Sequence, residues 1–325
     1  MIDLTIIIPH FNSPSYLKDL LETIPAFDNI QIIVVDDRSD KYIEDYIELK
    51  NSVDLSYVDF FENTKGRKGA GACRNIGLQE AKGKWILFAD ADDFFEKKFY
   101  EHVQKYFASE LDIIFFIPTS VDRDTRQVAH RHSYYKEILE SYINLQSLKN
   151  ELQLRYLMST PWSKMIRREL IETNNIQFDE IIVSNDIAFS TKVGFHMKHV
   201  LVSPETIYCV TNNTSSLTKT LTESNYDIRL NVFIWRYNFL KEHLAKSEFI
   251  MLDKLNMLAW SKILAIIKYK LGIRKGLYVI KLFKKNSIKV VNKHWVNPLY
   301  FFSIIAITVG MIRIFMKDKR FYVKR

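Results

Sequence analysis

Three carboxylates follow an apolar stretch in the first third of the chain, where residues 89–93 have the sequence Ala-Asp-Ala-Asp-Asp. Like charges this close repel one another unless a cation neutralises them. Oxygen ligands without a neighbouring cysteine or histidine favour magnesium or manganese over zinc. The segment therefore predicts a site for Mn²⁺ or Mg²⁺. The alternative is a solvated acidic turn that caps a helix near Lys97, and the neighbouring elements make it the weaker interpretation.

Two other polar clusters also follow apolar runs. Residues 10–12 (His-Phe-Asn) come after the run 4–9, and residues 36–39 (Asp-Asp-Arg-Ser) come after the run 31–35. Clusters of this kind, each placed where a strand ends, are candidates for the walls of one ligand site.

Small residues at positions 69–73 precede Arg74 in a segment that we expect to begin a helix. Free backbone amides at such a helix start suit a phosphate. The segment lacks the Gly-Lys-Ser/Thr of a Walker loop, and it does not follow the first strand as a dinucleotide-binding fingerprint would. Alone, it does not define a ligand.

The elements that must position these clusters alternate between short apolar runs and helical segments. This alternation predicts an α/β domain with a mostly parallel central sheet covered on both faces. In such sheets ligands bind at the carboxyl ends of the strands, where all three polar clusters fall. The expected strands are residues 4–8, 31–35, 55–60, 84–89 and 112–117, and the expected helices are residues 13–24, 41–49 and 69–81.

The composition suits a folded protein with two regions of opposite charge. Hydrophobic residues make up 47% of the 325, and the two cysteines give no disulfide framework, which fits a reduced cytoplasmic setting. Residues 4–9 are too short an apolar run for a secretory signal. Residues 241–325 carry 19 Lys/Arg and four Asp/Glu, whereas residues 1–240 carry 27 and 34. We therefore expect an acidic catalytic body and a basic attachment region.

The basic region mixes its charges with apolar residues. Basic residues on apolar helices at about 256–285 are typical of an anionic membrane surface. Residues 295–312 are eighteen uncharged residues, the lower limit for a spanning helix. We expect helices lying on the cytoplasmic leaflet; a short spanning or re-entrant helix and a buried helix of a soluble dimer are the alternatives. Nucleic-acid binding is not expected, because the apolar content exceeds what tracking phosphates requires.

Four segments together resemble the family 2 glycosyltransferases in order and spacing. They are residues 6–12, 34–39, 73–78 and 88–93, and the resemblance continues through residues 161–170 to about Thr218. It implies the GT-A fold, a nucleotide-sugar-binding fold, and an inverting transfer from a nucleoside-diphosphate sugar, most readily a UDP-sugar.

The resemblance also implies roles for individual residues. The loop from Pro9 to Asn12 and the carboxylates at 36–37 would hold the base and ribose, with Arg74 near the phosphates. Asp92 would coordinate the metal directly, and Asp90 would approach both ribose and metal. The implied donor-binding residues are Pro9, Phe11, Asn12, Asp36, Asp37, Arg74 and Asp90.

An inverting displacement needs a base on the acceptor side. In the family this is usually the Asp of a Glu-Asp pair, and the matching residues here are Asn185 and Asp186, so Asn185 departs from the pattern. We expect Asp186 to be the base. A helix N-cap is the alternative role, and one residue can serve as both.

Weaker candidates lie around this segment. Trp162 and Lys164 could line an acceptor pocket or contact phosphate, although a packed tryptophan and a solvated lysine are as plausible. His196 and His199 could supply a third metal ligand, but the helix surface is their default place. Residues 215–218 resemble a loop that closes over the donor in the family.

These observations predict a catalytic domain over residues 1–225 and a basic, helical, membrane-associating region over residues 226–325. The expected enzyme extends a lipid-linked or cell-surface glycan at the cytoplasmic face of the membrane. One alternative is a catalytically inactive membrane scaffold that binds nucleotide sugars, suggested by Asn185. A nucleotidyltransferase is another, but it normally has a Gly-Gly loop after its first strand, where this chain has residues 9–12 (Pro-His-Phe-Asn).

Overall fold

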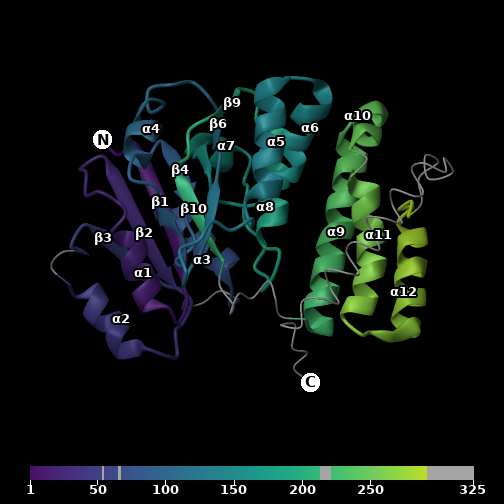
Figure 1. Ribbon diagram of the computed structural model, residues 1–325, viewed down its shortest axis with the longest axis horizontal. Helices are drawn as coiled ribbons and strands as arrows, with labels where there is room; N and C mark the ends of the chain where they lie inside the picture. The colour runs from purple at the N-terminus through teal and green to yellow at the C-terminus, as the bar shows by residue number, and fades with distance from the viewer. Residues whose placement is uncertain (53–54, 65–66, 213–220, 253, 291–325) are drawn as a thin grey trace. The chain divides into compact units, whose positions relative to one another are not determined.

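The computed structural model describes residues 1–52, 55–64, 67–212, 221–252 and 254–290, with only the backbone at 254–257 (Figure 1). The chain divides into two compact units, Met1–Thr214 and Ser215–Arg325. The first contains both sheets and the second consists of helices in its described part.

The main sheet of the first unit has seven strands in the order β3-β2-β1-β4-β8-β6-β9. Every neighbouring pair is parallel except those made by β8, which runs antiparallel to β4 and β6. The predicted α/β fold with a mostly parallel sheet is therefore confirmed. The strands are β1 (Leu4–His10), β2 (Ile30–Asp36), β3 (Val58–Glu62), β4 (Trp85–Phe88), β6 (Ile113–Phe116), β8 (Lys164–Arg167) and β9 (Val200–Ser203).

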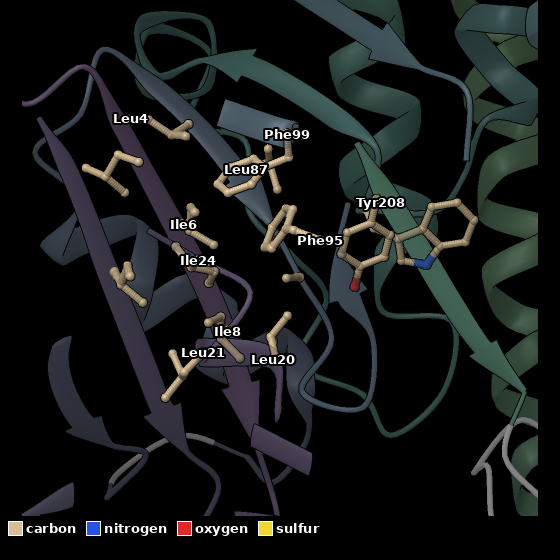
Figure 2. Close-up of a cluster of buried hydrophobic side chains, with 14 of the residues drawn as sticks. Leu4, Ile6, Ile8, Leu20, Leu21, Ile24, Leu87, Phe95, Phe99 and Tyr208 are labelled. Atoms are coloured by element: carbon tan, nitrogen blue, oxygen red, sulfur yellow. The ribbon is translucent and has the colours of Figure 1, made fainter. Parts of the chain in front are cut away.

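Helices cover this sheet, and both faces of β1 are buried. Leu4, Ile6 and Ile8 alternate along β1 and pack with the Leu20 and Leu21 side chains of α1 (Figure 2). Ile7, between them, belongs to a cluster on the other face. Continuous burial explains the continuous apolar runs of the strands. The helices of this unit are α1 (Pro14–Leu21), α2 (Ile43–Lys50), α3 (Ala70–Glu80), α4 (Phe99–Gln104), α5 (Ser133–Asn144), α6 (Leu148–Leu157), α7 (Arg168–Thr173) and α8 (Asp186–His196).

The first strand extends beyond its predicted end. We expected proline to stop it, but β1 includes Pro9, which pairs with Val35 in the parallel register of β1 and β2. On the other side of β1, the pairing with β4 ends at Ile7 and Phe88. Pro9 therefore lies where the sheet has only one neighbour to satisfy, so its missing N–H is tolerated.

A small second sheet, whose strands alternate along the chain with strands of the main sheet, was not predicted. Its order is β5-β10-β7, with β5 (Phe94–Phe95) antiparallel and β7 (Thr119–Asp122) parallel to β10 (Tyr208–Asn212). β5 follows the carboxylate segment 90–93 almost at once. This short pairing fixes the far end of that segment to β10.

The described part of the second unit comprises four helices, α9 (Glu223–His243), α10 (Lys246–Met251), α11 (Lys254–Lys268) and α12 (Gly272–Lys285). Tyr226 of α9 donates a hydrogen bond to the carbonyl of Lys262 on α11 at 2.9 Å. Phe233 of α9 and Phe283 of α12 bring their ring centroids to 5.9 Å. Over the described ranges, none of the helices is both long and apolar enough to cross a membrane. The expected apolar segment 295–312 lies outside the described residues.

Candidate active site

The carboxyl ends of β1 and β2 meet in register, with His10 opposite Asp36. His10 Nδ1 and Asp36 Oδ1 are 2.7 Å apart, and both residues are buried. Ser13 donates its backbone N–H to His10 Nε2 at 3.2 Å, so Nε2 is the acceptor and Nδ1 carries the proton given to Asp36. Ser39 adds two more donors to the Asp36 carboxylate, at 2.6 and 2.8 Å.

These bonds set the charge of Asp36. Burial would raise the pKa of the Asp36 carboxyl, but the hydrogen bonds from His10 and Ser39 outweigh burial and hold that pKa below its ordinary value. The side chain is therefore an anion, and both of its oxygens accept hydrogen bonds from His10 and Ser39.

Asn12 ties the loop after β1 to the loop after β2. Its side-chain oxygen accepts the backbone N–H groups of Asp40 and Lys41, each at 2.9 Å, and its amide donates to the Asp40 carboxylate at 2.7 Å. The backbone of Asn12 has a φ of +52°, a conformation that asparagine tolerates better than most residues. Asn12 thus holds the geometry of the predicted base-binding loop.

Phe11, next to it, is the aromatic residue that this loop exposes. Its side chain is 43% exposed, and Lys68 Nζ lies 4.5 Å from the ring centroid. A flat ring on a fixed loop is a suitable surface for stacking a nucleobase.

Asp37 joins the loop after β2 to the start of α3. One of its carboxylate oxygens accepts from the Asn63 side chain and the other from the Gly69 backbone N–H, both at 2.7 Å. Gly69 has a φ of +137°, which glycine adopts without strain. The predicted phosphate-binding helix start is therefore held by the β2 loop.

Arg74 lies one turn into α3 and is 5% exposed. It donates to Asp90 Oδ1 at 2.6 Å and to the side-chain oxygen of Asn185 at 2.9 Å. Its Nε has no hydrogen-bond partner within the described part of the chain. We call the two contacts the arginine bridge, because they join the carboxylate segment after β4 to the residue before Asp186.

The segment that carries Asp186 is also fastened to α3 at two other points. Asn75 exchanges two hydrogen bonds with the backbone of Phe178, at 3.0 and 2.8 Å. At Gly71 a Cβ atom would lie 2.2 Å from the carbonyl oxygen of Asp179, so only glycine permits this approach. The helix that begins at the predicted phosphate site therefore positions the predicted base as well.

Asp186 is the first residue of α8 and is partly buried. The cap position belongs to Asn185, so the predicted N-cap role of Asp186 is wrong, although an acidic first residue still suits a helix start. Burial raises the pKa of the Asp186 carboxyl above its ordinary value, while the nearby charges of Arg74 and Lys164 oppose the rise. A raised pKa makes a carboxylate a better proton acceptor near neutral pH.

The carboxylate segment separates into residues of two kinds. Asp93 is 1% exposed and accepts hydrogen bonds from the Tyr208 hydroxyl at 2.9 Å and the Thr211 backbone at 2.7 Å. Burial and the charges of Asp92 and Asp90 hold its pKa well above the ordinary value. Asp93 therefore anchors the segment to β10, whereas Asp90 and Asp92 stay partly exposed beyond the carboxyl end of β4.

Tyr208 fixes the same segment from its other side. Its hydroxyl accepts the backbone N–H of Asp90 at 2.8 Å while donating to Asp93. Thr211 donates its hydroxyl to the carbonyl of Asp92 at 2.6 Å. Four hydrogen bonds between β10 and residues 90–93 thus set the backbone from which Asp90 and Asp92 project.

The residues present fit a hard divalent cation. Asp90 and Asp92 are partly exposed oxygen donors on a rigid segment, and Arg74 occupies only one oxygen of Asp90. The described residues contain no group of three or more His, Cys, Asp or Glu that could hold a metal ion by themselves. Two carboxylates completed by substrate phosphates and water are a common arrangement for Mg²⁺.

The weaker candidates have other surroundings. Trp162 is 3% exposed and packs its ring parallel to that of Tyr208, with centroids 6.0 Å apart. Lys164 is buried, so the alternative of a solvated lysine is wrong; it donates to the Met158 carbonyl and lies 3.5 Å from the Ser190 hydroxyl. A polar contact of Lys164 with phosphate stays a prediction.

His196 ends the helix that Asp186 begins. Ten residues of α-helix separate the two by about 15 Å. His199 lies beyond it, where its backbone N–H bonds to Asp112 at 2.8 Å. Among the described residues, neither histidine forms a group of three or more potential metal ligands with the carboxylates, so the structure does not support either one as a third ligand. Residues 215–218 lie outside the described residues.

The class of protein follows from this architecture. The fold is a GT-A glycosyltransferase fold, and it is similar to the structure of Staphylococcus aureus TarS residues 1–349 in complex with UDP-GlcNAc, with a TM-score of 0.58, 21% identity and coverage of 76% of this chain and 69% of that chain. It is also similar to the mannosyltransferase PcManGT from Pyrobaculum calidifontis in complex with GDP-Man and Mn²⁺, with a TM-score of 0.53, 14% identity and coverage of 97% and 87%.

The family follows from the sequence comparisons. The model described as "Glycosyl transferase family 2" matches residues 5–174, more than half of the chain. The chain belongs to this family and is a glycosyltransferase, as the motifs predicted.

The chain matches two relatives over different shares of their length. EpsH of Bacillus subtilis (strain 168) is 23% identical over 257 residues, covering 75% of this chain and 71% of that protein. The poly(ribitol-phosphate) β-N-acetylglucosaminyltransferase TarS of Staphylococcus aureus (strain Mu50) is 26% identical over 236 residues, covering 64% of this chain but only 39% of TarS.

Proposed function

We propose that this chain transfers a sugar, with inversion, from a nucleoside-diphosphate donor to a hydroxyl group of a glycan acceptor. The arginine bridge is the observation that carries the proposal. It holds Asp90, one of the two proposed metal ligands, and Asn185, the residue before the proposed base, against one buried guanidinium, with contacts of 2.6 Å to Asp90 and 2.9 Å to Asn185. A donor half and an acceptor half of one site are thereby fixed relative to each other, as an in-line displacement requires.

Asp186 accepts the proton of the attacking hydroxyl. As the acceptor oxygen forms its bond to the anomeric carbon, the bond from that carbon to the diphosphate breaks, and the hydroxyl proton passes to the Asp186 carboxylate. The raised pKa of Asp186 makes its carboxylate a stronger proton acceptor than an ordinary aspartate. Attack from the face opposite the leaving group inverts the anomeric configuration.

The leaving diphosphate gains negative charge in this step. Asp90 and Asp92 would hold Mn²⁺ or Mg²⁺, which supplies Lewis-acid stabilisation to the diphosphate when bound. Arg74 adds a fixed positive charge from a position that is 95% buried, where reduced screening makes it more effective than it would be in water.

A UDP-sugar is the proposed donor, supported by the UDP-GlcNAc bound to the related TarS structure. Pro9, Phe11 and Asn12 would form the wall against the base, with Phe11 stacking and Asn12 holding the loop. Asp36 and Asp37 shape this wall through the internal hydrogen bonds described above.

The acceptor is proposed to be a lipid-linked or cell-surface glycan, reached at the cytoplasmic face of the cell membrane. The catalytic domain would comprise residues 1–225, and residues 226–325 would form the region that associates with the membrane. The supporting observation is charge, since residues 241–325 carry 19 Lys/Arg against four Asp/Glu.

A screen of nucleotide sugars for release of nucleoside diphosphate tests the proposal. We expect UDP release that requires Mn²⁺ or Mg²⁺, stops in EDTA and is lost in Asp92→Ala. Full activity in EDTA would show that the reaction does not require a divalent metal.

Asn185 motivates one second candidate, an inactive protein that binds nucleotide sugars, because the charged pair expected before α8 is incomplete. Calorimetric titration with UDP and Mn²⁺, set beside the turnover assay, separates the two. Tight UDP binding with no turnover of any donor, in the presence of membrane fractions as acceptor source, would favour the inactive protein.

A further inference from the structure

Helix α12 has an exposed apolar row that nothing in the catalytic account uses. Ile273, Leu277 and Ile280 are 81%, 63% and 49% exposed, although they are large apolar side chains. Their spacing of four and three residues places them on one face of the helix. Val279 and Phe283, on another face, are buried within the second unit, so α12 is already anchored and the exposed row is not its packing face.

A basic row runs beside the apolar one. Arg274, Lys281 and Lys285 are exposed and lie seven and four residues apart, again on one face. Lys275 does not belong to this row, because it bonds to Glu223 and Asp227 of α9 at 2.9 and 2.8 Å. The sequence from 254 to 290 contains ten Lys/Arg and no Asp/Glu, so nothing in it neutralises the basic row.

We propose that this double row on α12 is the surface by which the protein lies on a bilayer containing anionic phospholipid. The apolar row would enter the boundary between headgroups and acyl chains, and the basic row would face the lipid phosphates. The inference rests on the proposed membrane location and names the element and side chains responsible for it.

Charge decides against a second copy of the chain as the occupant. A twofold dimer through α12 would place the same surface patch on both sides of the contact. Two copies of the basic row would then be brought close together, with no carboxylate on either helix to compensate their charge. An anionic lipid surface relieves this repulsion and accepts the apolar side chains as well.

Co-sedimentation of the full chain with vesicles tests the surface. We expect binding to vesicles of phosphatidylcholine with phosphatidylglycerol and at least tenfold weaker binding to phosphatidylcholine alone. The triple variant Arg274→Gln, Lys281→Gln and Lys285→Gln should weaken binding to the anionic vesicles about a hundredfold, at about fivefold for each basic residue near the surface. Leu277→Gln with Ile280→Gln should weaken it at least tenfold.

Two matched controls separate the surface from net charge and from general hydrophobicity. Lys18→Gln with Lys50→Gln and Lys97→Gln removes the same charge from exposed positions of the first unit, and Ile47→Gln removes an apolar side chain that is 50% exposed on α2. Both controls should bind vesicles as the unaltered chain does. Circular dichroism checks that each variant is folded.

Equal binding to neutral and anionic vesicles would overturn the proposal, as would α12 variants that bind as well as the controls. A lipid-free dimer that dissociates in the α12 variants would overturn it in favour of a second copy. Release of UDP from a soluble donor is measured in parallel. Failure of that release with vesicle binding intact would defeat the proposed function and leave the lipid surface standing.

Discussion

Removing one end of the arginine bridge should cost stability in a predictable amount. In Asn185→Ala the guanidinium of Arg74 loses its 2.9 Å acceptor at a site where both residues are more than 90% buried. A hydrogen bond to a charged group contributes about 1.5–3 kcal/mol, and water cannot readily replace the acceptor in a buried site. For a domain of this size 1 kcal/mol shifts Tm by about 2–4 °C. We therefore expect Tm to fall by about 3–12 °C.

The isosteric change Asn185→Asp should behave differently. It keeps an oxygen acceptor for Arg74 and makes the contact an ion pair, so Tm should stay close to that of the unaltered protein. It also places a negative charge next to Asp186, whose pKa burial already raises. A like charge raises the pKa of a carboxyl further. The acidic limb of kcat/KM against pH should therefore move to higher pH.

Thermal unfolding monitored by circular dichroism and a pH series of UDP release measure the two effects. Asn185→Ala reports the effect of losing the contact with Arg74, and Asn185→Asp reports the effect of adding a negative charge. An unchanged Tm in Asn185→Ala would refute the buried bridge. A pH profile of Asn185→Asp that coincides with that of the unaltered enzyme would speak against Asp186 as the base.

Three further predictions concern other contacts of the site. Tyr208→Phe removes the hydroxyl that joins Asp90 and Asp93, so the free energy of unfolding should fall by about 1–3 kcal/mol and KM for the donor should rise; an unchanged KM in steady-state kinetics would contradict this. Gly71→Ala should lower kcat and Tm, because its Cβ would meet a backbone oxygen at 2.2 Å. In the control Gly276→Ala the nearest neighbour of the Cβ would be 3.8 Å away, so this change should stabilise the protein by about 0.5–1 kcal/mol. Equal Tm shifts in the two variants would show that the clash at Gly71 is not real. Activity of the unaltered enzyme should rise with an apparent pKa above 3.8, because the base is ionised only above its raised pKa; a profile flat down to pH 4 would speak against Asp186.

The parallel half of the sheet was predictable from sequence because its strands are buried on both faces. Short continuous apolar runs such as the one that becomes β1 are typical of buried strands when helical segments alternate with them. Strand β8 was missed because its residues Lys164–Arg167 begin and end with a cation. Both cations are buried in the fold, where the carbonyls of Met158 and Leu111 accept their N–H groups.

The sequence shows the residues proposed for the donor side of the candidate site, but not the contacts that support them. Carboxylates at a strand end are visible in the sequence, but a sequence does not show that Asp93 turns inward to Tyr208, 115 positions away. Asn12 was expected to contact the donor. The hydrogen bonds of its side-chain oxygen join the loop after β1 to the loop after β2. Such long-range hydrogen bonds leave no periodic signal, so only the fold reveals them.

The role of Asp186 is the central claim, and Asp186→Asn tests it most directly. The variant should release UDP from the active donor about 10²–10⁴-fold more slowly, the range for loss of a general base. Calorimetry with UDP and Mn²⁺ should give the same Kd as the unaltered enzyme within about twofold, a change of less than 0.5 kcal/mol. Turnover at the unaltered rate, with binding intact, would contradict the account and move the base to another residue.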